Sequence, residues 1–229
     1  MSKSSVRSPQ SSQVHTRSVV VWGLFCALAY LCVMLIRIPV VQFLKYEPKD
    51  VILMIGAFIY GPLPGLFMTV VVSLVEMVTI SDTGWIGALM NILSSGAFVC
   101  TAAAIYRRRH TLKGAIVGLA VGSVTMVAVM MIWNALITPL YMGVPRAAVL
   151  DMLLPVFLPF NLLKTVLNSA LVMLLYKRVV TALRYARLLP PTASGAAKPA
   201  TRSTVAVLLV SLVLIATAVL VILALQGIL

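Results

Sequence analysis

Long apolar stretches separated by short polar segments run through most of the chain. A helix that crosses a bilayer needs about 20 mostly apolar residues, and the successive stretches predict helices at 18–36, 50–60, 65–80, 83–106, 112–137, 154–176 and 205–225. The second and third come from one apolar run, interrupted by the segment GPLPG at 61–65, because glycine and proline favour a turn. The pattern predicts an all-α integral membrane protein, a six-helix transmembrane bundle plus an extra C-terminal transmembrane helix.

Four segments follow from this map. Residues 1–17 form an N-terminal tail, 18–180 the transmembrane bundle, 181–203 a basic linker rich in Pro and Ala, and 204–229 the additional C-terminal helix. The first apolar run is longer than the core of a signal peptide and has no cleavage site after it, so we expect the first helix to be retained.

The composition supports a membrane protein. Hydrophobic residues make up 62% of the 229 residues and charged residues 10%, whereas soluble domains carry about 25% charged residues. So few charges exclude a soluble enzyme, a secreted disulfide scaffold and a disordered chain. The three cysteines lie within predicted spans, where we interpret them as packing residues.

The net charge of +13 at pH 7 indicates topology rather than nucleic-acid binding. Basic residues gather before the first span, between the fourth and fifth, and between the sixth and seventh. Since Lys and Arg accumulate in cytoplasmic segments, we expect a cytoplasmic N-terminus. An odd number of spans would place the C-terminus outside.

Motifs for catalysis are missing from the sequence. It contains no G-x-x-x-x-G-K-[ST] loop, no H-E-x-x-H and no G-x-S-x-G, so neither ATP hydrolysis by a P-loop nor metal or serine hydrolysis is expected. We therefore predict no catalytic residues, no metal site and no resident cofactor.

Polar residues within the predicted spans are the candidate site. A charge in the bilayer costs at least ~2.5–3.5 kcal/mol, yet the sixth span carries Lys164. Asn161 and Asn168 share its helix face by their i, i+3, i+7 spacing. Further polar residues on the fifth and fourth spans are Asn134, Thr138, Tyr141 and Asn91.

These residues share a depth. At about 1.5 Å per residue, they lie roughly 20 to 31 Å from the cytoplasmic charges, in the outer half of the bundle. They predict a pocket open to the outside that suits a flat, polar, near-neutral ligand with carbonyl and hydroxyl groups. Alternatively, the asparagines only join helices by hydrogen bonds worth about 0.6 kcal/mol each. Glu76 either pairs with Lys164 or lies near the outer interface.

Two further features have open interpretations. The loop at 37–50 is either a lid that becomes ordered over a ligand or an interfacial aromatic belt. Gly23 and Ala27 on the first helix form a pair of small residues, for packing within the bundle or against a partner. Glycines on the fifth helix, at Gly114, Gly118 and Gly122, favour internal packing.

Six segments together resemble the riboflavin-specific S component of energy-coupling factor (ECF) vitamin transporters. They follow one another in order over residues 18–178: FLKYEPKD at 43–50, IGAFIYGP at 55–62, TISDTG at 79–84, GALMN at 87–91, NALITPLY at 134–141 and PFNLLK at 159–164. The resemblance implies a six-helix S component with an outer vitamin site, lined by helices four to six and capped by the loop after the first helix.

The resemblance also implies ligand, partners and site residues. It implies capture of riboflavin, with FMN left open, in the cell membrane of a prokaryote. The implied partners are a transmembrane coupling subunit and two cytoplasmic ATPases. Asn134, Asn161 and Lys164 would hydrogen-bond the flavin. The full predicted substrate-binding set is Leu44, Lys45, Tyr46, Glu47, Asn91, Asn134, Thr138, Tyr141, Asn161, Lys164 and Asn168.

Two departures and two rival hypotheses remain. The family often has an A-x-x-x-A contact motif on its first helix, and the nearest match here is Gly23 with Ala27, the predicted partner interface. The seventh span lies beyond the family's six. The rivals are an intramembrane enzyme, with Lys164 or Glu76 transferring a proton, and a vitamin-independent membrane scaffold.

Overall fold

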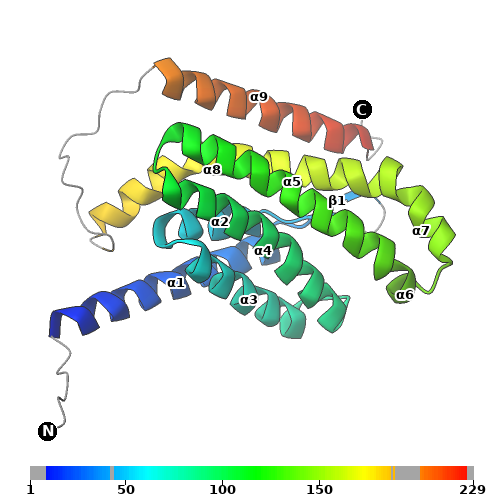
Figure 1. The fold of residues 1–229 in the computed structure, drawn as a ribbon, viewed down its shortest axis with the longest axis horizontal. Coiled ribbons are helices and arrows are strands. Elements are labelled where there is room, and N and C mark those ends of the chain that lie inside the picture. Colours follow the sequence, from blue (N-terminus) through cyan, green and yellow to red (C-terminus); the bar gives the residue numbers. More distant parts are fainter. Residues whose placement is uncertain (1–8, 42–43, 187, 189–201, 226–229) are drawn as a thin grey trace, which may run out of the picture.

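Long helices lie side by side in the computed structural model, which describes residues 9–41, 44–186, 188 and 202–225 (Figure 1). The long helices are α1 (Pro9–Leu35), α2 (Lys49–Tyr60), α3 (Pro62–Thr79), α4 (Gly84–Arg108), α5 (Leu112–Leu136), α8 (Leu158–Tyr185) and α9 (Arg202–Leu225). The shorter elements are strands β1 (Ile38–Val41) and β2 (Leu44–Tyr46), helices α6 (Thr138–Met142) and α7 (Arg146–Met152), and the π-helical turn η1 (Leu153–Phe157).

The predicted helical membrane fold is confirmed, with fewer full spans than expected. Within the described ranges, five helical stretches are long and apolar enough to cross a membrane: Thr16–Leu35, Pro62–Thr79, Gly84–Arg108, Leu112–Leu136 and Arg146–Leu183. Helix α2 has 12 residues, about 18 Å at 1.5 Å each, too short for a core of about 30 Å. The apolar stretch of α9, Leu208–Ala224, is also shorter.

Helix α2 forms the centre of the bundle and contacts α1, α3, α4 and α8. Most of its apolar residues are buried, among them the consecutive Leu53, Met54 and Ile55. It ends at Gly61, whose φ of +101° suits glycine, and Pro62 opens α3. The predicted break in the apolar run is therefore present.

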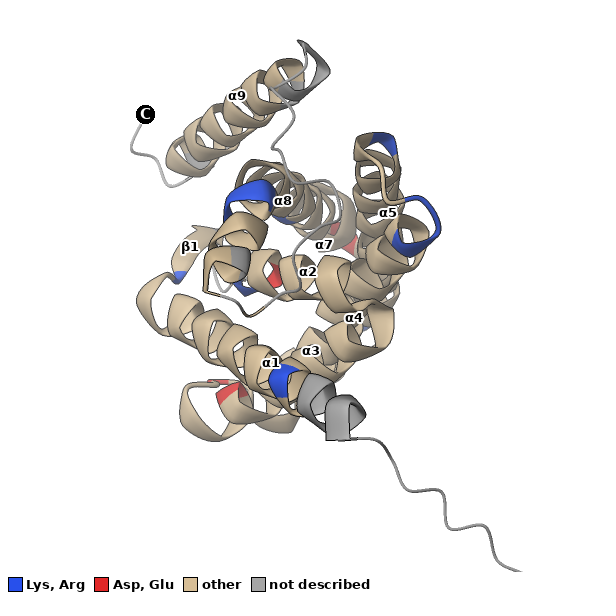
Figure 2. Ribbon diagram, turned by 90° about the vertical axis from the view of Figure 1, so that its left-hand side faces the viewer, with Lys and Arg blue, Asp and Glu red and all other residues tan. Residues whose placement is uncertain are grey.

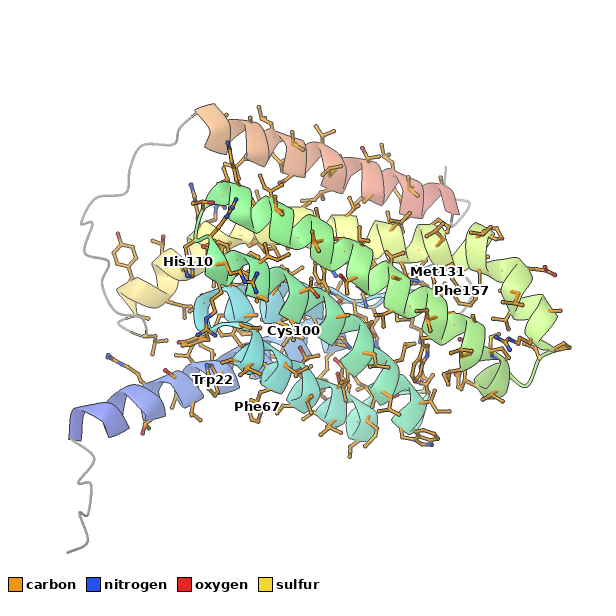
Figure 3. The ribbon with its side chains drawn as sticks, viewed as in Figure 1. Trp22, Phe67, Cys100, His110, Met131 and Phe157 are labelled. Atoms are coloured by element: carbon orange, nitrogen blue, oxygen red, sulfur yellow. The ribbon has the colours of Figure 1, made fainter. Side chains whose placement is uncertain are left out.

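Side chains fill the space between neighbouring helices without disulfides (Figure 3). The Trp22 ring on α1 packs against Phe67 on α3, with 6.1 Å between ring centroids. All three cysteines are free, and Cys100 approaches the carbonyl of Pro62 with an Sγ–O distance of 3.6 Å. Cys26 and Cys100 pack between helices, as the sequence predicted.

The basic flanks converge on one end of the bundle. Figure 2 looks toward the end where α1 begins, α4 joins α5 and α8 ends, and Lys and Arg gather there. Because the helices alternate in direction, the end of α3 and the start of α4 lie at the opposite end (Figure 1). The two ends of the bundle therefore differ in charge, which is the asymmetry that the positive-inside rule uses.

The glycines of α5 pack inside the bundle, as predicted. A Cβ on Gly118 would lie 2.7 Å from the backbone oxygen of Ala102, and one on Gly122 would lie 2.8 Å from that of Phe98. Both oxygens belong to α4. The absence of side chains on this stripe lets the two backbones approach closely, which is the main use of small residues between helices in lipid.

Replacing Gly118 with alanine is expected to destabilise the bundle by about 1–3 kcal/mol, because the new methyl group overlaps a backbone oxygen. Gly23→Ala on α1 is the matched control, since a Cβ there meets no described atom within 4 Å. Thermal unfolding in detergent should show a lower midpoint for Gly118→Ala alone. Equal midpoints for the two variants would contradict close α4–α5 packing at Gly118.

The loop expected between the first two helices contains a hairpin. Strands β1 and β2 pair antiparallel, with Ile38 opposite Tyr46 and Pro39 opposite Lys45. Residues 42 and 43, part of the predicted lid, lie outside the described residues. A second apolar cluster joins this hairpin to α8 and to α9; its buried members are Val40, Tyr46, Leu167, Ala218 and Ile222. The extra C-terminal helix therefore packs beside the hairpin.

The linker boundary differs from the expectation. Helix α8 continues through residue 180 to Tyr185, so the start of the predicted linker at 181–203 is helical. The rest of that linker falls largely within 187 and 189–201, outside the described residues.

Candidate ligand-binding site

A cavity of about 390 Å³ lies at the end of the bundle opposite the basic flanks. Its walls come from the end of α3, the start of α4, the end of α5, α6, the start of α8 and the β1–β2 hairpin. This volume is typical of small-molecule sites. It is lined by Arg37, Leu44, Lys45, Glu47, Glu76, Ser81, Asp82, Thr83, Ile86, Gly87, Met90, Asn91, Ser94, Met126, Met130, Trp133, Asn134, Ile137, Thr138, Tyr141, Phe160, Asn161 and Lys164.

Most of the predicted substrate-binding residues lie on this wall. They are Leu44, Lys45, Glu47, Asn91, Asn134, Thr138, Tyr141, Asn161 and Lys164. They come from four separate parts of the chain, and the fold brings them together around one space. Whether they bind a ligand stays a prediction.

Two asparagines on the wall keep hydrogen-bonding capacity. Asn134 Oδ1 accepts a 2.9 Å hydrogen bond from the Thr138 hydroxyl, and Asn161 Nδ2 donates to the Phe157 carbonyl at 2.8 Å. Among the described residues, no group bonds to Asn134 Nδ2 or Asn161 Oδ1. The wall thus offers Asn134 Nδ2 as a donor and Asn161 Oδ1 as an acceptor. The other amide atom of each side chain makes a hydrogen bond within the chain that holds the side chain in place.

Tyr46 and Asn168 do not line the cavity. The Tyr46 hydroxyl donates to Asn168 Oδ1 at 2.8 Å, and Asn168 Nδ2 donates to Asp50 Oδ2 at 3.3 Å. Both side chains are buried. They connect the hairpin, α8 and α2 behind the wall, so their contribution in this geometry is to support the site.

Lys164 has a carboxylate partner that the sequence did not indicate. Its Nζ lies 3.3 Å from Oδ2 of Asp50, which is completely buried. Asp50 Oδ1 accepts a 2.5 Å hydrogen bond from the Ser95 hydroxyl. A buried charge is tolerated when it is paired and hydrogen-bonded, and Asp50 meets both conditions. The ion pair accounts for a lysine deep in the bundle.

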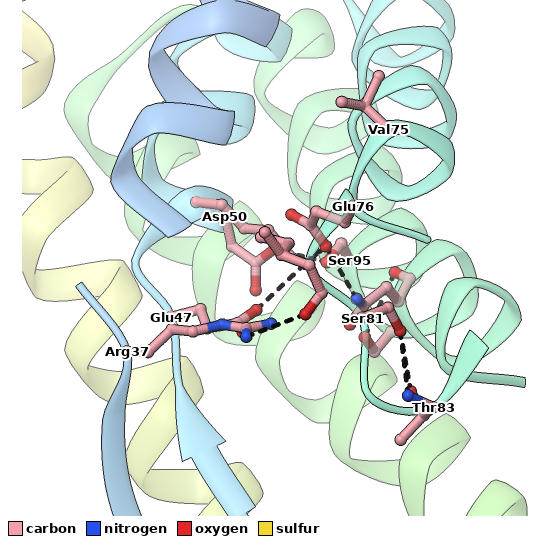
Figure 4. Close-up of polar contacts among 12 residues, drawn as sticks. Arg37, Glu47, Asp50, Val75, Glu76, Ser81, Thr83 and Ser95 are labelled. Carbon is pink, nitrogen blue, oxygen red and sulfur yellow. Dashed lines mark hydrogen bonds and ion pairs between the residues drawn. The ribbon is translucent and has the colours of Figure 1, made fainter. Parts of the chain in front are cut away.

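Glu76 pairs with Lys49 rather than with Lys164. Lys49 Nζ forms an ion pair with Glu76 and lies 3.3 Å from Glu47 Oε2, and Asn91 Nδ2 donates to Glu76 Oε2 at 3.1 Å. Figure 4 shows that the side chains of Glu47, Asp50 and Glu76 lie near one another.

The sequence predicted that this helix starts at residue 50, one residue from the observed start, but it also counted Lys49 and Asp50 in the outer loop at 37–50 and did not predict their burial. Helix α2 begins at Lys49, and both residues are buried. A usable signal was the proline at 48 followed directly by an apolar helix, because proline often stands at a helix start. The charged pair then belongs to the first turn of a buried helix.

The hairpin is tied to the α3–α4 loop at the cavity mouth. Arg37 donates to Glu47 at 2.9 Å and to the Ile80 carbonyl at 3.2 Å, and Lys45 Nζ lies 3.1 Å from Asp82 Oδ2. The hydrogen bond from Lys45 lowers the pKa of the exposed Asp82 carboxyl, because the bond and the nearby positive charge favour the ionised form. These bonds cross the mouth and agree with a lid in a closed position.

An apolar wall completes the cavity, and the sequence analysis missed it. It consists of Met90, Met126, Met130, Trp133 and Phe160. Three of them follow one face of α5 at i, i+4 and i+7, the face that also carries Asn134, and this periodicity could have revealed them. Aromatic and thioether groups facing amides suit a planar molecule with polar edges.

Comparison with known proteins places the chain in a family. The model of the family "ECF transporter, substrate-specific component" matches residues 17–176. The riboflavin transporter RibU of Staphylococcus aureus (strain TCH60) is 28% identical over 149 residues, 62% of this chain and 78% of that protein. The riboflavin transporter FmnP of Bacillus subtilis (strain 168) is 24% identical over 172 residues, 70% and 90% of the two chains.

The fold agrees with that match. The solved structure of the S component of a bacterial ECF transporter superposes with a TM-score of 0.63 at 25% identity, covering 74% of this chain and 99% of that one. The family match ends before α9, so the extra helix lies outside it. The resemblance seen in the sequence is thereby confirmed: this chain belongs to the substrate-specific (S) components of ECF transporters.

Proposed function

We propose that this chain captures riboflavin at the outer face of a prokaryotic cell membrane, as the S component of an ECF transporter. The observation that supports this most is the cavity itself, with an amide donor and an amide acceptor on one wall and aromatic and thioether groups on the other. The relatives from Staphylococcus aureus and Bacillus subtilis described above are riboflavin transporters by name. An S component is a non-enzymatic substrate-binding subunit.

The chemistry of the flavin fits such a cavity. The isoalloxazine ring is flat and carries carbonyl oxygens and an imide N–H along one edge, while the ribityl chain adds hydroxyl groups. Each cation on the wall faces a carboxylate within 3.3 Å: Arg37 with Glu47, Lys45 with Asp82, and Lys164 with Asp50. Since these charges are already paired, the site favours the uncharged vitamin over its phosphate ester, FMN.

Orientation and partners complete the proposal. The basic end of the bundle would face the cytoplasm, which puts the N-terminus inside and the cavity mouth outside. A transmembrane coupling subunit and two cytoplasmic ATPases would supply the energy, and Gly23 with Ala27 would contact the coupling subunit. Both residues are exposed on α1, which supports contact with a partner over packing within the bundle.

Titration of the detergent-purified protein with riboflavin tests the proposal. Saturable quenching of flavin fluorescence is expected, with weaker binding of FMN. A vitamin-independent scaffold or an unrelated membrane enzyme would give no saturable signal with either flavin, and that result would contradict the proposed function. A flavin absorbance band in the protein as purified would give independent support.

Breaking the bond between Lys45 and Asp82 should speed ligand release. Asp82→Asn removes an exposed ion pair across the cavity mouth, and such pairs contribute little each, so riboflavin should dissociate about two- to fivefold faster in stopped-flow fluorescence. Asp151→Asn, an exposed carboxylate on α7 away from the cavity wall, is the control and should leave the rate unchanged.

The same bond gives a pH dependence with a defined sign. Because Lys45 lowers the pKa of Asp82, the carboxylate stabilises the closed hairpin above its ordinary pKa. That contribution is lost as the pH falls through the lowered pKa. Parent and Asp82→Asn should therefore release ligand at similar rates only in strong acid, and equal rates at neutral pH would contradict a role for this pair in the lid.

A further inference from the structure

Glu76 is a buried carboxylate on the cavity wall with one oxygen engaged and one unengaged. The residue is 3% exposed and comes from α3. Oε2 accepts from Lys49 Nζ and from Asn91 Nδ2. Oε1 is shielded from solvent and accepts no hydrogen bond from any residue in the described part of the chain.

An unsatisfied buried acceptor is rare in a native protein and calls for a physical explanation. Among the described residues, the other buried side-chain atom in this condition is Trp22 Nε1, which does not line the cavity. Glu47 provides the contrast. It also lines the cavity and also pairs with Lys49, yet its Oε1 bonds Arg37 and its Oε2 lies near Lys49, so both oxygens are engaged.

The surroundings of Glu76 hold it as an acceptor. The Lys49 ammonium beside Oε2 stabilises the ionised carboxylate, and an ionised carboxylate can only accept hydrogen bonds. Lys49 itself does not line the cavity. Two donors from two other helices hold the carboxylate through Oε2, which leaves Oε1 as the oxygen that a ligand donor can engage.

We propose that Glu76 is a ligand-binding residue, in which Oε1 accepts a hydrogen bond from a donor on the bound flavin. The donor is either the imide N–H of the ring or a hydroxyl of the ribityl chain. The inference rests on the proposed function and adds α3 to a site that sequence reasoning had confined to the fourth to sixth helices and the loop. A charged acceptor in the wall makes the site discriminate against analogues that lack the donor.

Three flavins and three proteins test the proposal. Riboflavin, 3-methylriboflavin (without the imide N–H) and lumiflavin (without the ribityl hydroxyls) are titrated into the parent, Glu76→Gln and Glu47→Gln. In Glu76→Gln the amide turns its oxygen to Lys49 and Asn91, which leaves its NH₂ group where Oε1 was. Riboflavin should then bind about ten- to a hundredfold more weakly, because a hydrogen bond to a charged group is lost.

The analogue whose binding is least affected by Glu76→Gln shows which flavin group donates to Oε1, because that analogue lacks the donor. Glu76→Gln should affect that analogue far less than it affects riboflavin, so methylation of the imide or loss of the ribityl chain removes most of the effect of the substitution. Glu47→Gln also removes one charge beside Lys49, but it removes no unengaged acceptor. It should therefore weaken all three flavins by similar factors.

Equal weakening of all three flavins by Glu76→Gln would overturn the proposal and assign Glu76 a structural role. Glu76→Asp, which retains the charge beside Lys49 but shortens the side chain by one methylene, repeats the comparison if Glu76→Gln fails to fold in thermal unfolding. Failure of the parent to bind riboflavin would instead contradict the proposed function, so the two failures are distinguishable.

Discussion

Replacing both Asn134 and Asn161 with alanine is expected to weaken riboflavin binding by well over a hundredfold while the helical bundle stays folded. Each side chain offers the cavity one amide group that no described residue engages, and each is held by a bond through its other atom. Losing a buried hydrogen-bond partner costs about 1–3 kcal/mol, or roughly 5- to 150-fold in affinity. The two losses should combine, because the residues lie on different helices. Fluorescence titration measures the effect.

Asn168→Ala is the matched control for the asparagine pair. It removes the same amide from a buried helix position, but Asn168 bonds Tyr46 and Asp50 behind the wall. We expect this variant to lower the thermal unfolding midpoint and to change affinity much less than the double variant does. Parental affinity in the folded double variant would contradict the site.

Lys164 needs a different substitution strategy. Truncating it to alanine would leave the Asp50 carboxylate buried beside Ser95 and Asn168 without its cation. Removing one partner of a buried ion pair costs about 3–5 kcal/mol, so loss of binding in Lys164→Ala would mix ligand contact with unfolding. The asparagine pair separates the two effects.

Uptake into cells is expected to collapse when Gly23 and Ala27 on α1 are both replaced with leucine, while binding in detergent survives. Both residues are exposed, and a Cβ on Gly23 meets no described atom, so the bundle can accommodate the added bulk. A coupling subunit that approaches this face closely could not. The cavity lies at the other end of the bundle, which is why binding should persist. Radiolabelled riboflavin accumulation is the measurement.

The control places the same bulk on another exposed helix surface. Ala120→Leu with Val124→Leu, both exposed on α5, should leave uptake near the parental rate. If the α1 double variant also accumulates riboflavin at the parental rate, this face is not the contact with the coupling subunit. If that variant loses binding as well, the pair serves packing inside the molecule.

Several features of this protein follow from the sequence alone. The helix positions do, since lipid leaves a spanning chain only helices or a closed barrel to satisfy its backbone polar groups, and continuous apolar runs of about 20 residues indicate helices. The break at Gly61 and Pro62 follows because glycine adopts backbone conformations that other residues avoid, and proline fixes φ and has no backbone N–H to donate. Asn134, Asn161 and Lys164 could be placed in one pocket, because polar groups inside a bilayer are costly and helical spacing reports which of them share a face.

Only the tertiary structure decided which groups meet. Helical periodicity says that a face is buried but not which neighbour covers it, so the pairing of Lys164 with Asp50 and of Glu76 with Lys49 was not predictable. The hairpin depends on backbone bonds between β1 and β2, and the place of α9 depends on apolar contacts with that hairpin and α8. Each of these features depends on contacts between residues far apart in the chain. A local pattern of hydrophobic and polar positions does not specify which distant residues come into contact.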